Sequence, residues 1–114
     1  MAAPMIIGLH VQVVIDRPLG SIHPEHPTIQ YPVNYGYVPG IIGGDGERQD
    51  VYVFDMNEPV KQMTGFVIGI IHRRNDSEDK WIVTPKFRLI TVDEIRRRTH
   101  FQEKYFDDEI WLLN

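Results

Sequence analysis

The stretch 31–55 reads YPVNYGYVPGIIGGDGERQDVYVFD, and it decides the fold. Its apolar and aromatic runs predict two strands, and the glycines between them permit the positive φ angles of a tight reversal. Such a turn brings Asp45 and Glu47 back toward Asp50 at the start of the second strand. Three carboxylates at one tip repel one another unless a cation lies among them, which favours a hard metal ion bound through oxygen. The alternative is a solvated acidic turn, because Asp and Gly are common at hairpin tips for conformational reasons alone.

Outside this stretch, the chain has three more strand patterns and one helix pattern. The strand patterns are at 7–15, 64–72 and 80–84. Thr91 followed by Glu94 is a capping box, and it opens a helix that runs to residue 105 or 106. The apolar tail 109–113 returns to the body as a strand or lies across it. We therefore predict a mainly β (α+β) fold, a small five-stranded OB-like β-barrel with a C-terminal helix.

Composition predicts one domain, 1–114, and excludes several classes of function. The 114 residues are 42% apolar, which is enough for a single core. The net charge of −4 argues against nucleic-acid binding, because that requires a basic surface. Cysteine is absent, so disulfides and cysteine nucleophiles are excluded, and residence in the cytoplasm fits best. The N-terminal residues 1–14 lack a charged leader and a long apolar run, so we expect neither a signal peptide nor a membrane span.

Two motifs in the central stretch carry a specific resemblance. YPVNYGYVP at 31–39 is followed by DGERQDV at 45–51. In this order they resemble the soluble family I inorganic pyrophosphatases, whose signature is YPxNYGY(I/V)P and then a DGDPxD(V/A) loop. Weaker resemblance continues through 13–21, 69–85 and 100–105, so it covers most of the chain. The chain is similar to a short member of that family with a divergent active site.

The resemblance implies a metal site made of carboxylates. Glu47 takes the place of the family's middle Asp, which binds metal and helps to deprotonate the attacking water, so Glu47 is also a predicted catalytic residue. A second acidic tip at 75–79 matches further metal ligands, with Asn75 as the alternative to Asp76. The predicted metal ligands are Asp16, Asp45, Glu47, Asp50, Asp76 and Asp79. Mg²⁺ is the predicted cofactor, and Mn²⁺ would fit the same oxygen ligands.

The resemblance also implies side chains that contact phosphate. Lys80 and Tyr35 match catalytic positions, and Tyr31 and Tyr105 match two further tyrosines of the family's site. Lys80, Arg17, Tyr35 and Tyr105 would stabilise the leaving phosphate electrostatically. The implied substrate is pyrophosphate or a related small diphosphate.

Departures from the family pattern fall mostly on the cationic side of the site. The family has a lysine shortly after the serine that matches Ser21, and this chain has none there. Arg17 or His23 is expected to replace an arginine from a segment that this chain largely lacks. Phe106 stands where the family has a phosphate-binding lysine, and Lys104 is the candidate that compensates for it.

We therefore expect Mg²⁺-dependent hydrolysis of pyrophosphate to two phosphates by a metal-activated water. One alternative is a catalytically impaired module that binds metal or phosphate compounds as a sensor or interaction protein. Another is hydrolysis of a bulkier diphosphate, because the shortened N-terminal segment would open the site. The apolar tail and the resemblance both favour a homo-oligomer, with no nucleic-acid or membrane partner.

Overall fold

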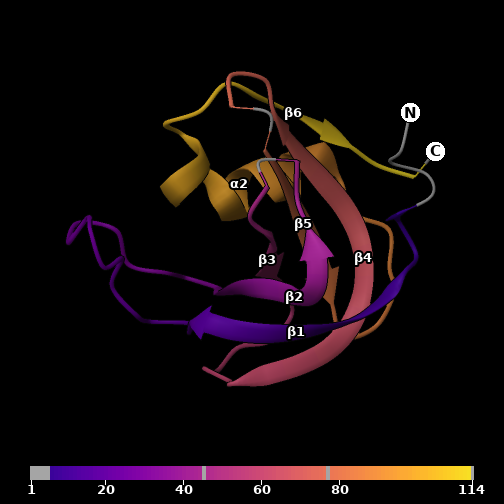
Figure 1. Cartoon of the computed structure of the whole chain (residues 1–114), viewed down its shortest axis with the longest axis horizontal. Helices are drawn as coiled ribbons and strands as arrows, with labels where there is room; N and C mark the ends of the chain where they lie inside the picture. The colour runs from indigo at the N-terminus through magenta and orange to yellow at the C-terminus, as the bar shows by residue number, and fades with distance from the viewer. Residues whose placement is uncertain (1–5, 45, 77, 114) are drawn as a thin grey trace.

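Six strands and the helix α2 form the body of the chain (Figure 1). The structure is a computed structural model that describes residues 6–44, 46–76 and 78–113. The elements are β1 (His10–Arg17), β2 (Asn34–Ile42), β3 (Arg48–Val53), β4 (Gln62–Arg73), β5 (Asp79–Thr84), α2 (Val92–Glu103) and β6 (Asp108–Trp111).

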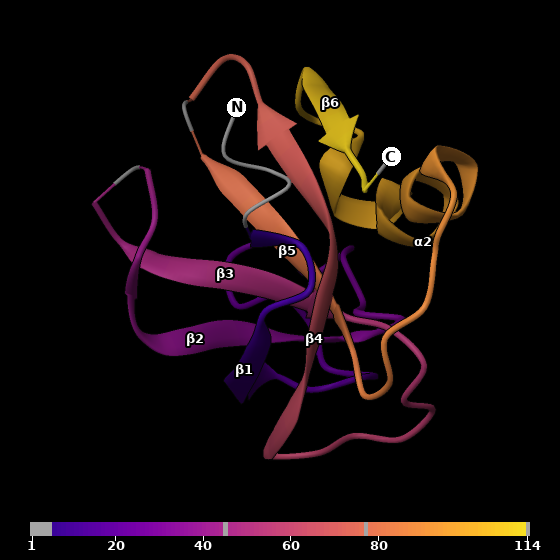
Figure 2. The same ribbon diagram turned by 90° about the vertical axis from the view of Figure 1, so that its right-hand side faces the viewer.

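Five of these strands close into a barrel. They hydrogen-bond in the order β1-β2-β3-β5-β4, and β4 pairs back onto β1. The β3–β5 pair is parallel, and the other barrel pairs are antiparallel. The long β4 pairs with β1 through its first half and with β5 through its second half, and Figure 2 shows it running past both. β6 adds to the end of β4. The predicted five-stranded OB-like barrel with a C-terminal helix is confirmed.

The apolar side chains divide between two cores because strand residues alternate in direction. Val51 of β3 and Val83 of β5 are fully buried in the first core, inside the barrel. Their neighbours Tyr52 and Ile82 point the other way and pack with Ile95 of α2 in the second core. The helix therefore covers part of the outer face of the sheet. The uncovered part of that face can hold a binding site.

Gly36 shows why the central motif needs a glycine. It lies opposite Ile15 of β1, where a Cβ would come within 1.9 Å of the backbone carbonyl oxygen of Val14. A side chain at this position would force the two strands apart. The sequence predicts a strand from Tyr31 onward, but residues 31–33 are not part of it. β2 begins at Asn34, because Pro32 has no N–H to donate to a neighbouring strand, and the residues before Asn34 form a loop.

Thr91 caps α2 as the capping box predicts. Its Oγ1 accepts a hydrogen bond from the backbone N–H of Glu94 at 3.1 Å. α2 ends at Glu103, slightly before the predicted end, and the chain then turns back to form β6. Within the described part of the chain, no helix is long and apolar enough to cross a membrane.

Candidate active site

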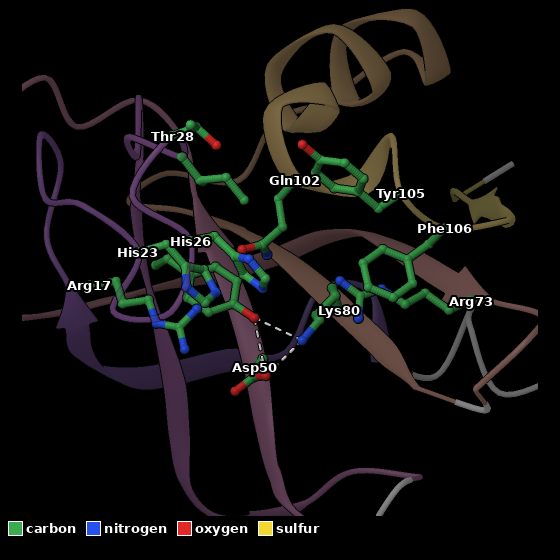
Figure 3. A pocket seen from close by; sticks show the side chains of 12 residues that line it. Arg17, His23, His26, Thr28, Asp50, Arg73, Lys80, Gln102, Tyr105 and Phe106 are labelled. Carbon is green, nitrogen blue, oxygen red and sulfur yellow. Dashed lines mark hydrogen bonds and ion pairs between the residues drawn. The ribbon is translucent and has the colours of Figure 1, made fainter.

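A cavity of about 520 Å³ lies on the outer face of the barrel, beside the end of α2 (Figure 3). Each barrel strand contributes one polar side chain to its lining: Arg17, Tyr35, Asp50, Arg73 and Lys80. The loop 18–33 adds His23, His26, Thr28 and Ile29, and the end of α2 with the turn after it adds Gln102, Tyr105 and Phe106. Among the described residues, three arginine or lysine side chains but one carboxylate line the cavity. This balance of charge suits an anionic ligand.

Strand register brings the central pair of this lining together. Val51 of β3 lies beside Trp81 of the parallel strand β5. Asp50 and Lys80 precede these two residues, so they also lie side by side, and both point away from the barrel interior. Local sequence alone cannot supply this pairing, because the two strands are separated by the whole of β4.

A β-bulge aims Arg17 into the cavity. The β1–β2 register pairs Ile15 and Arg17 with consecutive residues of β2, so Asp16 is an extra residue in β1. Bulges of this kind redirect a side chain. Arg17 Nη1 donates to the Tyr31 hydroxyl at 2.6 Å, and its guanidinium carbon lies 5.5 Å from the centre of the Tyr35 ring. The arginine is therefore held over two of the predicted site tyrosines.

Lys80 is the centre of a buried ion cluster. Its Nζ donates to Asp50 Oδ2 and to the Tyr35 hydroxyl, each at 2.7 Å, and also to Glu78. The Tyr35 hydroxyl in turn donates to Asp50 Oδ2 at 3.1 Å. Burial, reinforced by the charge of Asp50, raises the pKa of Tyr35 well above its usual value. The hydroxyl of Tyr35 therefore remains a hydrogen-bond donor at neutral pH.

Arg73 forms a second buried ion cluster. Its Nε and Nη2 donate to the two carboxylate oxygens of Glu103 at 3.0 and 2.7 Å, and its Nη1 donates to Glu78 at 3.2 Å. The ring of Phe106 covers the guanidinium, with 3.6 Å between the ring centre and Cζ. Burial disfavours the charged forms of both side chains, but the hydrogen bonds between Arg73 and Glu103 favour those forms more strongly. The pKa of Arg73 is therefore raised, and the pKa of Glu103 is lowered. Both groups are therefore ionised at neutral pH.

Hydrogen bonds through α2 connect the two arginines of the cavity. The Tyr31 hydroxyl, which accepts from Arg17, donates to Gln102 Oε1 at 2.5 Å. Gln102 Nε2 donates to the Tyr52 hydroxyl at 2.8 Å, and Tyr52 donates to Glu103 at 2.5 Å. Glu103 then holds the second arginine of the lining. The helix thus orients cationic side chains that come from β1 and β4.

Comparison with known proteins identifies the family. The inorganic pyrophosphatase of Rickettsia felis is 31% identical to this chain over 128 residues, which cover 93% of this chain and 72% of that protein. The chain belongs to the inorganic pyrophosphatase family. The inorganic pyrophosphatase of Rickettsia typhi is 29% identical over 118 residues, 87% of this chain and 66% of that protein. This pyrophosphatase-family chain thus spans 66–72% of the length of these two relatives. No protein-family model matches the sequence.

Solved structures of two other inorganic pyrophosphatases have the same fold. The enzyme from Ehrlichia chaffeensis gives a TM-score of 0.69 at 19% identity and covers 90% of this chain and 85% of its own. The enzyme from Neisseria gonorrhoeae gives a TM-score of 0.68 at 20% identity, with coverage of 86% and 74%. The barrel and helix of this pyrophosphatase-family chain are therefore those of the family.

The second acidic tip does not converge on the cavity of this pyrophosphatase-family chain as the sequence predicts. Side chains alternate along β5, so Asp79 points to the face opposite Lys80 and lies 2.7 Å from His72 Nδ1. Asp76 is in the preceding turn, 3.6 Å from Arg73. Glu78, two residues before Lys80, is the carboxylate of this tip that reaches the lysine.

Of the other predicted metal ligands, Asp50 lines the cavity. Asp16 is ion-paired with Arg48 at 3.3 Å, and burial raises the pKa of Asp16. Glu47 is exposed in the turn between β2 and β3, and Asp45 lies outside the described residues. In the part of the chain that the structure describes, no group of three or more His, Asp or Glu side chains is placed to hold a metal ion. The described carboxylates thus do not fit a resident metal cage.

Most of the predicted phosphate-binding residues line the cavity or contact a residue that does. Arg17 and His23, between which the sequence could not decide, both line the cavity, as does Tyr105 at its exposed rim. Tyr31 is buried behind Arg17 and holds it. Lys104 is exposed, with its Nζ 5.3 Å from the centre of the Tyr105 ring, and it does not line this cavity.

Several residues of the site were missed from sequence. Gln102 falls on the same helical stripe as Ile95 and Thr99, which predicts burial, and a buried amide requires hydrogen-bond partners. Glu78 lies two residues before Lys80, just ahead of β5, so alternation along an extended chain predicts that both side chains are on the same face. Arg73 lies just beyond the predicted strand 64–72, but it is the last residue of β4, and nothing in the local sequence shows that it is buried.

Proposed function

We propose that the chain binds pyrophosphate in this cavity and hydrolyses it to two phosphates. Membership of the inorganic pyrophosphatase family supports the reaction. The observation that carries the proposal is the contact of Lys80 Nζ with both Asp50 and Tyr35 in a cavity that is also lined by two arginines. A pyrophosphate anion needs several positive groups around it, and a hydrolase needs a carboxylate beside them to take a proton from water.

The reaction uses each of these groups in a defined way. Lys80 and Arg17 neutralise the phosphoryl oxygens, and their fixed positions lower the cost of the charge that develops on the leaving phosphate. A water oxygen bonds to one phosphorus while the bond from that phosphorus to the bridging oxygen breaks. Asp50 accepts the proton of this water, and the hydrogen bonds from Tyr35 and Lys80 hold its carboxylate in position.

Mg²⁺ stays part of the proposal as the family's expected cofactor, with Mn²⁺ as the substitute. When bound, such an ion would polarise phosphoryl oxygens and acidify a water. Because the described carboxylates do not gather into a site for it, we assign it no step. A single domain, a cytoplasmic location, self-association and the absence of nucleic-acid and membrane partners are likewise proposals.

Phosphate release from pyrophosphate, with and without Mg²⁺ or Mn²⁺, tests the activity. We expect Asp50→Asn to lower the rate by about 100- to 10,000-fold, because the amide cannot accept the proton. Asp107→Asn is the matched control, since Asp107 is an exposed residue paired with Arg74 and lies away from the cavity. Equal rates for the wild type and Asp50→Asn would reject this assignment.

A second candidate function is binding without turnover, as in a sensor. Asp50 Oδ2 already accepts hydrogen bonds from both Lys80 and Tyr35, so this oxygen has little remaining capacity to accept a proton from water. Calorimetric binding of pyrophosphate without phosphate release under any of these metals would favour this function.

A third candidate is hydrolysis of a bulkier diphosphate. The cavity of about 520 Å³ falls in the range of sites for whole organic molecules, and the Tyr105 side chain in its lining is exposed to solvent. A panel of pyrophosphate, nucleoside diphosphates and alkyl diphosphates distinguishes this reading, which requires faster release from an organic diphosphate.

A further inference from the structure

We infer that the cavity binds a diphosphate through its own buried cations, Arg73 and Lys80, and that this binding needs no divalent metal ion. The inference rests on the proposed ligand but not on turnover. It also departs from the metal site that the resemblance implies, because it gives the neutralising role to protein side chains.

The first observation is that lysine and arginine side chains already pair with the acidic groups. Lys80 is buried against Asp50 and Glu78, and Arg73 is buried against Glu78 and Glu103. Both oxygens of Glu103 accept from Arg73, and one of them also accepts from Tyr52. A metal ion would have to displace these internal donors before it could reach the carboxylate oxygens.

The second observation is the sign of the cavity surface. Glu78 and Glu103 do not line the cavity, whereas Arg17, Arg73 and Lys80 do. Asp50 is the one carboxylate among the described lining residues, so most of the charged groups that a ligand would touch are cationic. These cationic groups donate hydrogen bonds to phosphate oxygens and cannot coordinate a divalent metal ion.

Figure 3 shows how these groups are arranged for a ligand. Lys80 lies between Arg17 on one side and Arg73 on the other, with Asp50 close to the ammonium. The two arginines are held by different partners, Arg17 by Tyr31 and Arg73 by Glu103. The cationic side chains are therefore held in place without a ligand, so binding costs little side-chain conformational entropy.

Calorimetry with the non-hydrolysable analogue imidodiphosphate tests the inference in buffers that contain either EDTA or Mg²⁺. We expect dissociation constants that agree within about threefold, which is a small difference on the free-energy scale of binding. Mn²⁺ alone, followed by electron paramagnetic resonance, should not bind the wild-type protein. Binding that disappears in EDTA, or tight Mn²⁺ binding before ligand is added, would overturn the inference and leave the proposed function intact. No binding in either buffer would overturn both.

The neighbouring arginines 73 and 74 offer a matched pair of variants. Arg73→Gln leaves the charges of Glu78 and Glu103 unbalanced next to the cavity, so we expect about 10- to 100-fold weaker binding of the analogue in both buffers. Arg74→Gln changes an exposed side chain away from the cavity and should bind as the wild type does. Equal affinity of both variants would count against the role of Arg73. If Arg73→Gln does not fold, the wild-type comparison of the two buffers still decides the inference.

Discussion

Lys80→Met is expected to weaken pyrophosphate binding and to slow any phosphate release by at least about 100-fold, the usual loss when one preorganised donor is removed. Lys80 contributes a buried ammonium that contacts both Asp50 and Tyr35, so its loss removes a cation and frees the carboxylate to repel the ligand. Calorimetry and a phosphate-release assay measure the two effects separately. A protein that binds and turns over pyrophosphate without Lys80 would place the ligand elsewhere.

The same substitution should also cost stability, and this must be separated from the loss of function. Removing one partner of a buried ion pair typically destabilises a protein by about 3–5 kcal/mol, because the remaining charge is left without a partner. Binding should therefore be measured well below the melting temperature of the variant. Lys61→Met, at an exposed position away from the cavity, is the control and should retain wild-type binding.

Glu103→Gln is expected to lower the free energy of unfolding by about 3–5 kcal/mol at neutral pH. The carboxylate of Glu103 accepts two hydrogen bonds from Arg73 and one from Tyr52, and all three groups are buried. The amide cannot balance the charge of the arginine. Urea denaturation measures the effect, and Asp107→Asn, which breaks an exposed ion pair, should change stability by about 0–1 kcal/mol.

The pH dependence of stability checks the same pair independently. The pKa of Glu103 is lower in the folded chain than in the unfolded chain, because Arg73 outweighs the effect of burial. The stability that it contributes is therefore fully present above the unfolded value of about 4.3, and it is lost as the pH falls through the lower folded value. Glu103→Gln should lack this acid-dependent loss. If both proteins lose the same stability on acidification, the Glu103–Arg73 pair is not the source.

The fold follows from patterns that are local in the sequence. Alternating residues predict the strands, and the pair Thr91 and Glu94 predicts the start of the helix. These patterns involve residues that are close together in the sequence, so they can be recognised without knowing the tertiary structure. The exception, the late start of β2, depends on Pro32, whose missing N–H outweighs the β preference of its neighbours.

The site was predicted less completely because it depends on register and on contacts between distant segments. The bulge at Asp16 decides that Arg17 faces the cavity, and a bulge leaves no clear mark in one sequence. Asp79 was predicted as a metal ligand at this tip, but the alternation of side chains puts Glu78, two residues before Lys80, on the side of the lysine. The contacts of α2 with the barrel, which bury Glu103, depend on the final tertiary packing.

A crystal structure of the chain with imidodiphosphate is the most direct measurement of where the substrate binds. We expect phosphoryl oxygens within hydrogen-bond distance of Lys80 Nζ and the guanidinium of Arg17, with Asp50 beside the phosphorus that water attacks. An analogue bound outside this cavity, or bound in it without contact to Lys80 and Arg17, would contradict the assignment of the site.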